Sequence, residues 1–362
     1  MIHIMGTRND IPVAVHPGRI LKEELLSRGM KQKDFAHRIG MQASHLNEIL
    51  NGNRSVSNEI AYKLEQELGI PATHWVKLQA LYEYDVEVLK KQDIEEQEAS
   101  NKVAEYDRII SVSTIFNRLN ISARTFVERL SVLTTILGLP SPAEIEVNTK
   151  GSFRKFVKVG IDQRMILTWT ILAKYKCAQQ PLLPFKFDVS NANNLNSELS
   201  RIFHSNTDVI DRVKHLLNSY GIYFIIEEKV DKASIDGYSF MSNENPCIAV
   251  TLRNKNIDSF AFSVMHEIGH IVNGDIDDIE SLMEQNPESS KEKRADKYAM
   301  EALVPEELWG SAPMVSMNVY MIQKEFTKWA KQNNLHKWIV LGRVSHDTGI
   351  WKFKGDGQRM MR

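Results

Sequence analysis

Two histidines and a glutamate stand close together in the segment SVMHEIGHIVNGD, where His266, Glu267 and His270 make up the H-E-x-x-H pattern of zinc hydrolases. On a helix, residues four apart lie on one face, so both imidazoles can bind the same Zn²⁺. Glu267 can then reach a water molecule at the metal and act as general base. One accidental match in a chain of this length has a probability on the order of a few per cent, so the pentapeptide alone leaves an ordinary amphipathic helix as the alternative.

A catalytic zinc needs a third protein ligand as well as an open position for water. Glu292 and Asp296 are four residues apart in KEKRADKYAMEALVP, a segment that predicts a helix from about Ser290. We expect Glu292 to be the third ligand and Asp296 to accept the free N–H of a ligating histidine, which fixes the tautomer of that histidine. A solvated acidic pair is the alternative, and it is the less favoured one behind an H-E-x-x-H helix.

The transition-state oxyanion needs a further hydrogen-bond donor, for which Tyr298 and His346 are the candidates. Tyr298 fits a place in the core better, and His346 fits an ordinary surface or packing role equally well. Neither is therefore counted among the expected site residues.

A small sheet and two helices must position these side chains. The metal helix is expected over residues 258–272, with Asp258 or Ser259 as its N-cap, and a helix over residues 195–220 comes before the sheet. The strand at residues 248–252 could hold an extended peptide by strand addition. β-Branched and aromatic residues, separated by Gly, Pro and Asn, predict three strands at residues 221–230, 237–241 and 246–252.

Near the N-terminus, apolar residues at helical spacing and breaks at glycines predict four short helices. Residues 32–39, the turn at Gly40 and residues 42–50 have the dimensions of a helix-turn-helix. Any small helical bundle explains the apolar spacing equally well, but it does not explain the short polar groups on the outer side of the second helix. The candidates for base contacts are Gln42, Ser44, His45 and Asn47, with the choice among them left open, and the candidates for phosphate contacts are Gln32, Asn51 and Arg54.

The middle of the chain is highly charged over residues 83–108, which favours a solvated helix or connector over a dimerisation helix. A Pro-containing, extended stretch begins at residue 181. We therefore predict a multidomain protein, mainly α with an α+β part: a DNA-binding domain over residues 1–82, a helical connector over 83–180 and a metallopeptidase-like domain over 181–362.

Composition limits the number of domains, the cellular compartment and the types of metal ligand to be expected. The chain has 362 residues with 43% hydrophobic and 25% charged residues, enough for two or three folded domains. With neither a leader-like N-terminus nor a membrane-length apolar run, cytoplasmic residence is the expectation. Cys177 and Cys247 lie far apart in the sequence, so a metal site is expected to use His and carboxylates. A net charge of −1 does not exclude nucleic acid, because one basic face suffices.

The N-terminal part resembles the Xre-type helix-turn-helix of HigA-family antitoxins. The resemblance covers about residues 12–85 and rests on HPGRILKEELL, KQKDFAHRIG, LNGNRSVS and ELGIPATHWVKLQALYEYD, the last of which includes Trp75. It implies binding to operator DNA as a homodimer on a palindrome, and autoregulation of a toxin–antitoxin operon.

The C-terminal part resembles the ImmA/IrrE family of gluzincin-like metallopeptidases. The motifs are HEIGH, EKRADKYA and ALVP, and the resemblance spans about residues 186–353. It implies that His266, His270 and Glu292 bind zinc and that Glu267 is the general base.

Two functions follow as hypotheses. The first is a DNA-binding transcriptional regulator of the toxin–antitoxin or stress and phage-response type with an active zinc endopeptidase, which cuts itself, a repressor or a toxin. The second is an antitoxin-like repressor whose zinc domain senses a signal or binds a partner without turnover. A plain repressor with a metal-free C-terminal domain is a third interpretation. Zn²⁺ is the expected cofactor, and operator DNA, a toxin or repressor protein and a second copy of the chain are the expected partners, with no membrane partner.

Overall fold

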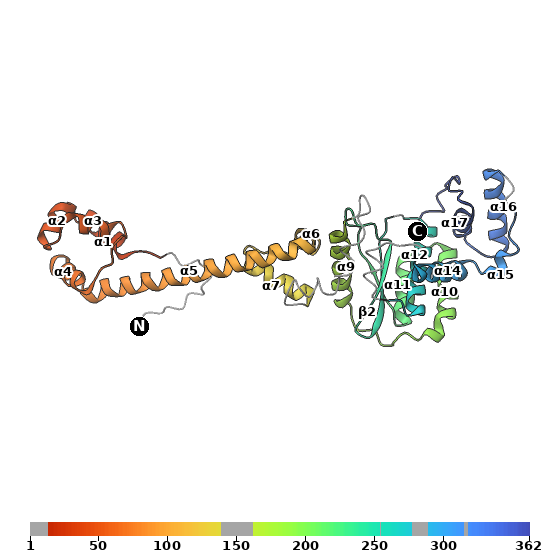
Figure 1. Ribbon diagram of the computed structural model, residues 1–362, viewed down its shortest axis with the longest axis horizontal. Coiled ribbons are helices and arrows are strands. Elements are labelled where there is room, and N and C mark those ends of the chain that lie inside the picture. The colour runs from red at the N-terminus through yellow and green to blue at the C-terminus, as the bar shows by residue number, and fades with distance from the viewer. Residues whose placement is uncertain (1–13, 139–161, 254, 277–288, 315–317) are drawn as a thin grey trace. The chain divides into compact units, whose positions relative to one another are not determined.

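The computed structural model describes residues 14–138, 162–253, 255–276, 289–314 and 318–362. The chain forms two compact units, one of residues 1–101 and 125–127 and the other of residues 102–124 and 128–362. Each unit has a hydrophobic core of its own, and in the described residues helices predominate over a single three-stranded sheet (Figure 1). The predicted fold class is confirmed, while the three-part division of the chain stays a prediction.

Four short helices and the start of a long one form the first unit. α2 and α3 confirm the predicted helix-turn-helix pair. Gly40 between them has a φ of 61°, a backbone conformation that residues with a Cβ rarely adopt. Phe35, Leu46 and Trp75 are almost completely buried where the helices meet. The helices are α1 (Pro17–Ser27), α2 (Gln32–Arg38), α3 (Ala43–Leu50), α4 (Asn58–Leu68) and α5 (Ala72–Ile109), whose last residues belong to the second unit.

The sheet of the second unit has the strand order β1-β3-β2, with β1 (Tyr223–Ile226), β2 (Gly237–Ser242) and β3 (Asn245–Val250). β3 is parallel to β1 and antiparallel to β2, so its backbone donors and acceptors are used on both sides. The prediction that a peptide adds to the strand at residues 248–252 is therefore wrong. Within the described part of the chain, β2 is an outer strand.

Helices cover both faces of this sheet. α9 packs on β1 and β2 from one face, and α12 packs on β2 and β3 from the other (Figure 1). Because side chains alternate along a strand, Tyr238 and Phe240 of β2 lie beneath Lys174 of α9, whereas Gly237 and Ser239 face α12. The helices are α6 (Val112–Arg118), α7 (Phe126–Leu137), α9 (Gln163–Ala178), α10 (Ala192–Ser205), α11 (Val209–Ser219), α12 (Ile257–Asn273), α14 (Ser290–Leu303), α15 (Glu306–Trp309), α16 (Val319–Gln332) and α17 (Lys337–Thr348).

Two predicted helix boundaries are wrong. The helix expected over residues 195–220 is broken into α10 and α11, because Asn206 and Asp208 both have a φ of 46°. Contacts with residues distant in the sequence stabilise this break. Asn206 Nδ2 donates hydrogen bonds to the carbonyl oxygens of Gln358 at 3.1 Å and Met360 at 2.9 Å. α12 has Asn256 as its N-cap rather than Asp258 or Ser259, and the Asp258 carboxylate accepts hydrogen bonds from Arg359 instead.

α5 is the longest described helix, with 38 residues, but charged side chains recur along it. Within the described residues, no helix combines the length with the apolar character that crossing a membrane requires.

Candidate metal centre

α12 and α14 pack closely and place their polar residues face to face. Gly269 allows the close approach, because a Cβ at this position would lie 3.0 Å from the Cα of Ala295 and 3.1 Å from the Cβ of Tyr298. Ser289 caps α14, and its hydroxyl accepts a hydrogen bond from the backbone N–H of Glu292 at 3.2 Å. This local capping fixes the first turn of α14, which carries Glu292.

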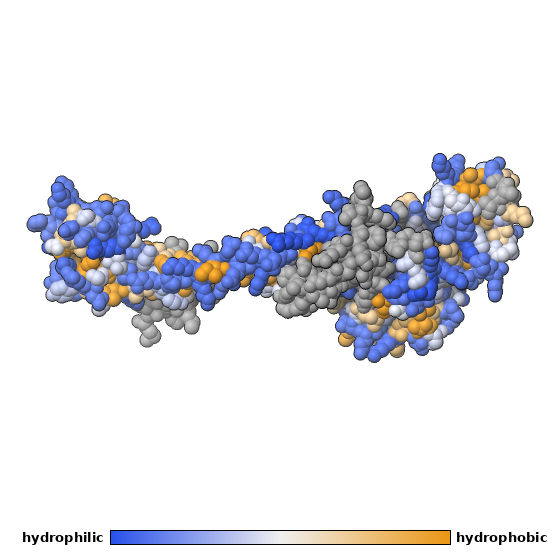
Figure 2. All heavy atoms as spheres, viewed as in Figure 1, coloured by the Kyte–Doolittle hydropathy of each residue, from blue (hydrophilic) through white to orange (hydrophobic). Residues whose placement is uncertain are grey.

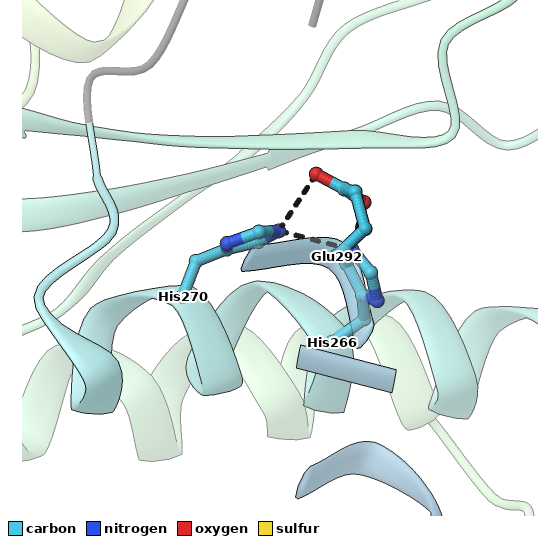
Figure 3. Close-up of side chains that lie close together, drawn as sticks. All are labelled: His266, His270 and Glu292. Carbon is cyan, nitrogen blue, oxygen red and sulfur yellow. Dashed lines mark hydrogen bonds and ion pairs between the residues drawn. The ribbon is translucent and has the colours of Figure 1, made fainter. Parts of the chain in front are cut away.

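Three donor side chains converge on one point between the two helices (Figure 3). His266 Nε2 lies 3.1 Å from His270 Nε2 and 3.2 Å from Glu292 Oε2, and His270 Nε2 lies 3.5 Å from Glu292 Oε1. Zinc bonds to nitrogen and oxygen of ~2.0–2.1 Å place tetrahedral ligand atoms ~3.3 Å apart. The three side chains therefore fit a zinc ion, with a fourth position left for water.

Asp296 contacts the far side of the first histidine, as predicted from its spacing to Glu292. Its Oδ1 lies 2.9 Å from His266 Nδ1. A carboxylate at this distance holds the proton on Nδ1, which leaves the lone pair of Nε2 directed at the point where the three donors converge.

Glu267 lines the same cavity as the three donors, lies against β2 and is 5% exposed. A Cβ on Gly237 would lie 2.5 Å from Oε1 of Glu267, and the Ser239 hydroxyl donates a hydrogen bond to the same carboxylate. β2 thus forms a close cradle for this side chain. Neither Gly237 nor Ser239 carries a sequence signal for the contact, because no motif links β2 to the H-E-x-x-H helix.

The carboxylates and the burial of the site shift two pKa values in the absence of metal. Burial lowers the pKa of His266, but hydrogen bonds to Asp296 and Glu292 and the negative charges of Glu267 and Asp296 together outweigh burial and raise that pKa to about 10. Burial raises the pKa of Glu267 to about 7, against the opposing effects of a positive His266 and the Ser239 hydrogen bond. A ligating histidine must be neutral, so zinc must displace a proton from His266, and its affinity rises with pH.

A cavity of about 270 Å³ opens over the three donors, with the start of β2 along one wall. A second cavity, also about 270 Å³, adjoins it and shares Asp236, Phe262 and Ser263 with the first. The lining of the second cavity is mainly apolar and includes Phe260, Met300, Leu303, Val304, Ile339 and Trp351.

The two candidates for an oxyanion donor lie in different places. Tyr298 is outside the lining of both cavities, and its hydroxyl accepts a hydrogen bond from Asn196 Nδ2 at 2.8 Å. His346 lines the apolar cavity and is about half exposed, with its Nδ1 3.1 Å from Asp347 Oδ1. Of the two, only His346 borders the space next to the three donors.

The candidate DNA-contacting residues lie on α2, at the N-cap of α3, on α3 and in the turn after α3. Arg54 pairs with Glu48 at 3.1 Å, and Asn51 Nδ2 donates to Asn47 Oδ1 at 3.1 Å. The surface over α2 and α3 is mostly hydrophilic (Figure 2). His45 is half-buried, and the exposed candidates are Gln32, Gln42, Ser44, Asn47, Asn51 and Arg54.

Comparison with known proteins assigns a family to each of these regions. Residues 21–75 match the family described as helix-turn-helix, and residues 219–324 match a peptidase family described as the IrrE N-terminal-like domain. Virulence-associated protein I of Dichelobacter nodosus is 32% identical over 92 residues, which are 25% of this chain and 84% of that protein. Virulence-associated protein A of the same organism is 38% identical over 69 residues, 18% of this chain and 68% of that protein.

A solved structure is also similar to a quarter of the chain. It is an addiction module antidote protein of a HigA family from Coxiella burnetii, 30% identical, with a TM-score of 0.22 and coverage of 24% of this chain and 96% of that one.

Proposed function

Because the chain belongs to the helix-turn-helix family in residues 21–75 and to the IrrE-like peptidase family in residues 219–324, we propose that it is a DNA-binding transcriptional regulator that carries a zinc-dependent endopeptidase. The observation that carries the proposal is the convergence of His266, His270 and Glu292 at zinc-ligand spacing, with a buried carboxylate beside them.

The residues around the donors suit peptide hydrolysis. When bound, Zn²⁺ supplies Lewis acidity, which makes water a stronger acid and the scissile carbonyl a better electrophile. Glu267 then accepts a proton from the attacking water and delivers it to the leaving amine. Burial raises the pKa of Glu267 to about 7 without metal, and the positive charge of bound zinc would lower it, so that the carboxylate is ionised and able to take a proton at neutral pH.

The substrate is proposed to lie in the cavity over the three donors, beside the start of β2. Asp236, Gly237 and Ser239 line the cavity over the donors. The adjoining apolar cavity accommodates a large apolar side chain of the same peptide.

Gly237→Ala is expected to lower kcat about 10²-fold while zinc stays bound. The added Cβ would lie 2.5 Å from Oε1 and 2.9 Å from Cδ of Glu267, so the general base must move. Rates and metal content are measured on the same preparation. The control is Gly355→Ala, where a Cβ meets nothing within 4 Å, and wild-type activity of Gly237→Ala would show that Glu267 does not need this position.

The helix-turn-helix unit is proposed to bind operator DNA as a homodimer. Arg54→Ala is expected to weaken binding to all sequences and to lower the slope of log affinity against log salt by about 1. Gln42→Ala is expected to make the free energy of binding less favourable by about 1–3 kcal/mol, and only on the preferred DNA sequence. Both are measured on a duplex that the wild-type protein selects from a random pool. Lys90→Ala, an exposed change on α5, is the control, and wild-type binding by both test variants would contradict the proposed interface.

The substrate is proposed to be a repressor or toxin protein encoded near the regulator. Zinc-loaded full-length protein is incubated with the product of the neighbouring gene and with itself, and mass spectrometry reads any new termini. Cleavage that stops when a chelator removes the metal supports the proposal. Intact proteins in every combination, together with stoichiometric zinc, would favour a partner-binding role.

A further inference from the structure

A hollow rich in positive charge lies in the second unit, away from the metal centre. It is called the basic hollow here and has a volume of about 660 Å³. Its lining shares no residue with the cavity over the three donors. The described lining contains two histidines and no Asp or Glu, and its Lys and Arg residues are Lys324, Lys328, Lys331, Lys337 and Arg362. Such a concentration is unexpected in a chain with 45 basic and 46 acidic residues.

Three of these lysines form one exposed row on α16. Lys324, Lys328 and Lys331 are spaced four and three residues apart, so they lie on one face of the helix. In the described part of the chain, none of the three has a carboxylate within 4.0 Å, whereas Lys337 pairs with Asp356. Like charges at this spacing destabilise a helix, and a bound anion would offset the repulsion.

The N-terminus of α17 adds to the positive potential of the basic hollow. His336 is the N-cap of this helix of 12 residues, and its side chain makes no capping hydrogen bond. Both His336 and Lys337 line the hollow. The first backbone N–H groups of a helix have no partner within the helix, and together with the helix dipole they favour a negative charge at this end.

The wall of the basic hollow also contains buried polar groups. Asn206 is 7% exposed and lines the basic hollow, and its Oδ1 has no hydrogen-bond partner among the described atoms. Its Nδ2 is occupied by two backbone carbonyls, so the amide is held in one orientation. Burial, followed by the positive charges of His204 and Lys337, lowers the pKa of His336 to about 4. Asn206 is thus a fixed, uncharged part of the wall of the basic hollow.

We infer that the basic hollow binds the phosphate groups of a small diphosphate or phosphate ester, the charged part of a nucleotide. The row of lysines, Arg362 and the first turn of α17 neutralise the phosphates. The volume of about 660 Å³ lies within the range of pockets for small molecules. A concave site suits a free nucleotide better than duplex DNA, whose phosphates require a long basic strip. A ligand bound at this site could regulate the protein independently of zinc and of operator DNA.

Calorimetric titration of the full-length protein tests the inference with two probes, ADP and inorganic pyrophosphate. Both are expected to bind saturably to the wild-type protein, because both carry a diphosphate group. The triple variant Lys324→Gln, Lys328→Gln, Lys331→Gln is expected to bind each at least about tenfold more weakly, because charge-assisted contacts to phosphate are lost. All three side chains are exposed, so the fold is retained, as thermal unfolding verifies.

A matched triple variant, Lys214→Gln, Lys229→Gln, Lys255→Gln, removes the same charge from the same unit outside the basic hollow. It is expected to bind both probes like the wild type. Equal binding by the two triple variants would overturn the inference, because it would place the probes on zinc or on the general charge of the protein. The inference would also be overturned if neither probe bound saturably to the wild-type protein. It would be overturned as well if the lysine-row triple variant bound both probes normally and lost only its binding to a short DNA duplex.

Discussion

Purified full-length protein is expected to carry one Zn²⁺ per chain, and His270→Ala is expected to lose it. His270 is 8% exposed, and its Nε2 lies 3.1 Å from His266 Nε2 and 3.5 Å from Glu292 Oε1. Its removal leaves two protein ligands where a catalytic zinc needs three. The affinity should therefore fall by more than the roughly 10- to 100-fold that loss of an outer hydrogen-bond partner costs. Elemental analysis of dialysed protein measures the metal content.

Two further variants calibrate the size of this effect. Asp296→Asn keeps the shape of the side chain but removes the carboxylate charge beside His266 Nδ1, so zinc affinity is expected to fall roughly 10- to 100-fold with the stoichiometry unchanged at saturation. His215→Ala, an exposed change on α11, is expected to bind zinc normally. Wild-type protein that holds no zinc after loading and dialysis would leave the plain repressor as the better interpretation.

The donors of the metal centre could be predicted because their arrangement follows from helix periodicity. His266 and His270 share a face of α12, and Glu292 and Asp296 share a face of α14, so each pair is fixed by local structure. The sequence alone does not say that the two helices cross at these residues. Gly269 is the local feature that permits the crossing, through its contact with Ala295 of α14.

The parts that could not be predicted depend on contacts between distant residues. β3 lies in the middle of the sheet because it pairs with β1 as well as β2. The residue pattern of a strand predicts which of its faces is buried but not which strands lie beside it. The break at Asn206 is stabilised by hydrogen bonds to Gln358 and Met360. Apolar periodicity continues through such a break, so it predicts one helix where tertiary contacts make two.

The distance between Cys177 and Cys247 is another feature that the sequence could not predict. They are far apart in the sequence, yet α9 and β3 bring the two buried thiols within hydrogen-bonding distance. The hydrogen bond from Cys247 lowers the pKa of Cys177, and burial raises the pKa of Cys247 well above its usual value. Sequence separation is thus a poor guide to the distance between two thiols once a helix packs on a sheet.

Glu267→Gln is expected to lower peptide cleavage about 10³-fold, the effect of removing a general base, while zinc content and DNA binding stay unchanged. The amide has the shape of the carboxylate and still accepts from the Ser239 hydroxyl, but it cannot take a proton. The pKa of Glu267 is about 7 without metal, and the positive charge of zinc lowers it. The wild-type rate should therefore rise with pH and level off below pH 7, and this rise should disappear in Glu267→Gln.

The same variant separates the two functions that the site could serve. Glu307→Gln, an exposed change on α15, is the control for the loss of one carboxylate. If Glu267→Gln abolishes cleavage and the cellular response together, the chemistry at this centre is what the regulator uses. If the variant binds zinc and the response survives unchanged, the peptidase proposal fails. The centre would then organise a domain that recognises a partner, because His266, His270 and Glu292 would bind the metal without Glu267 as a ligand.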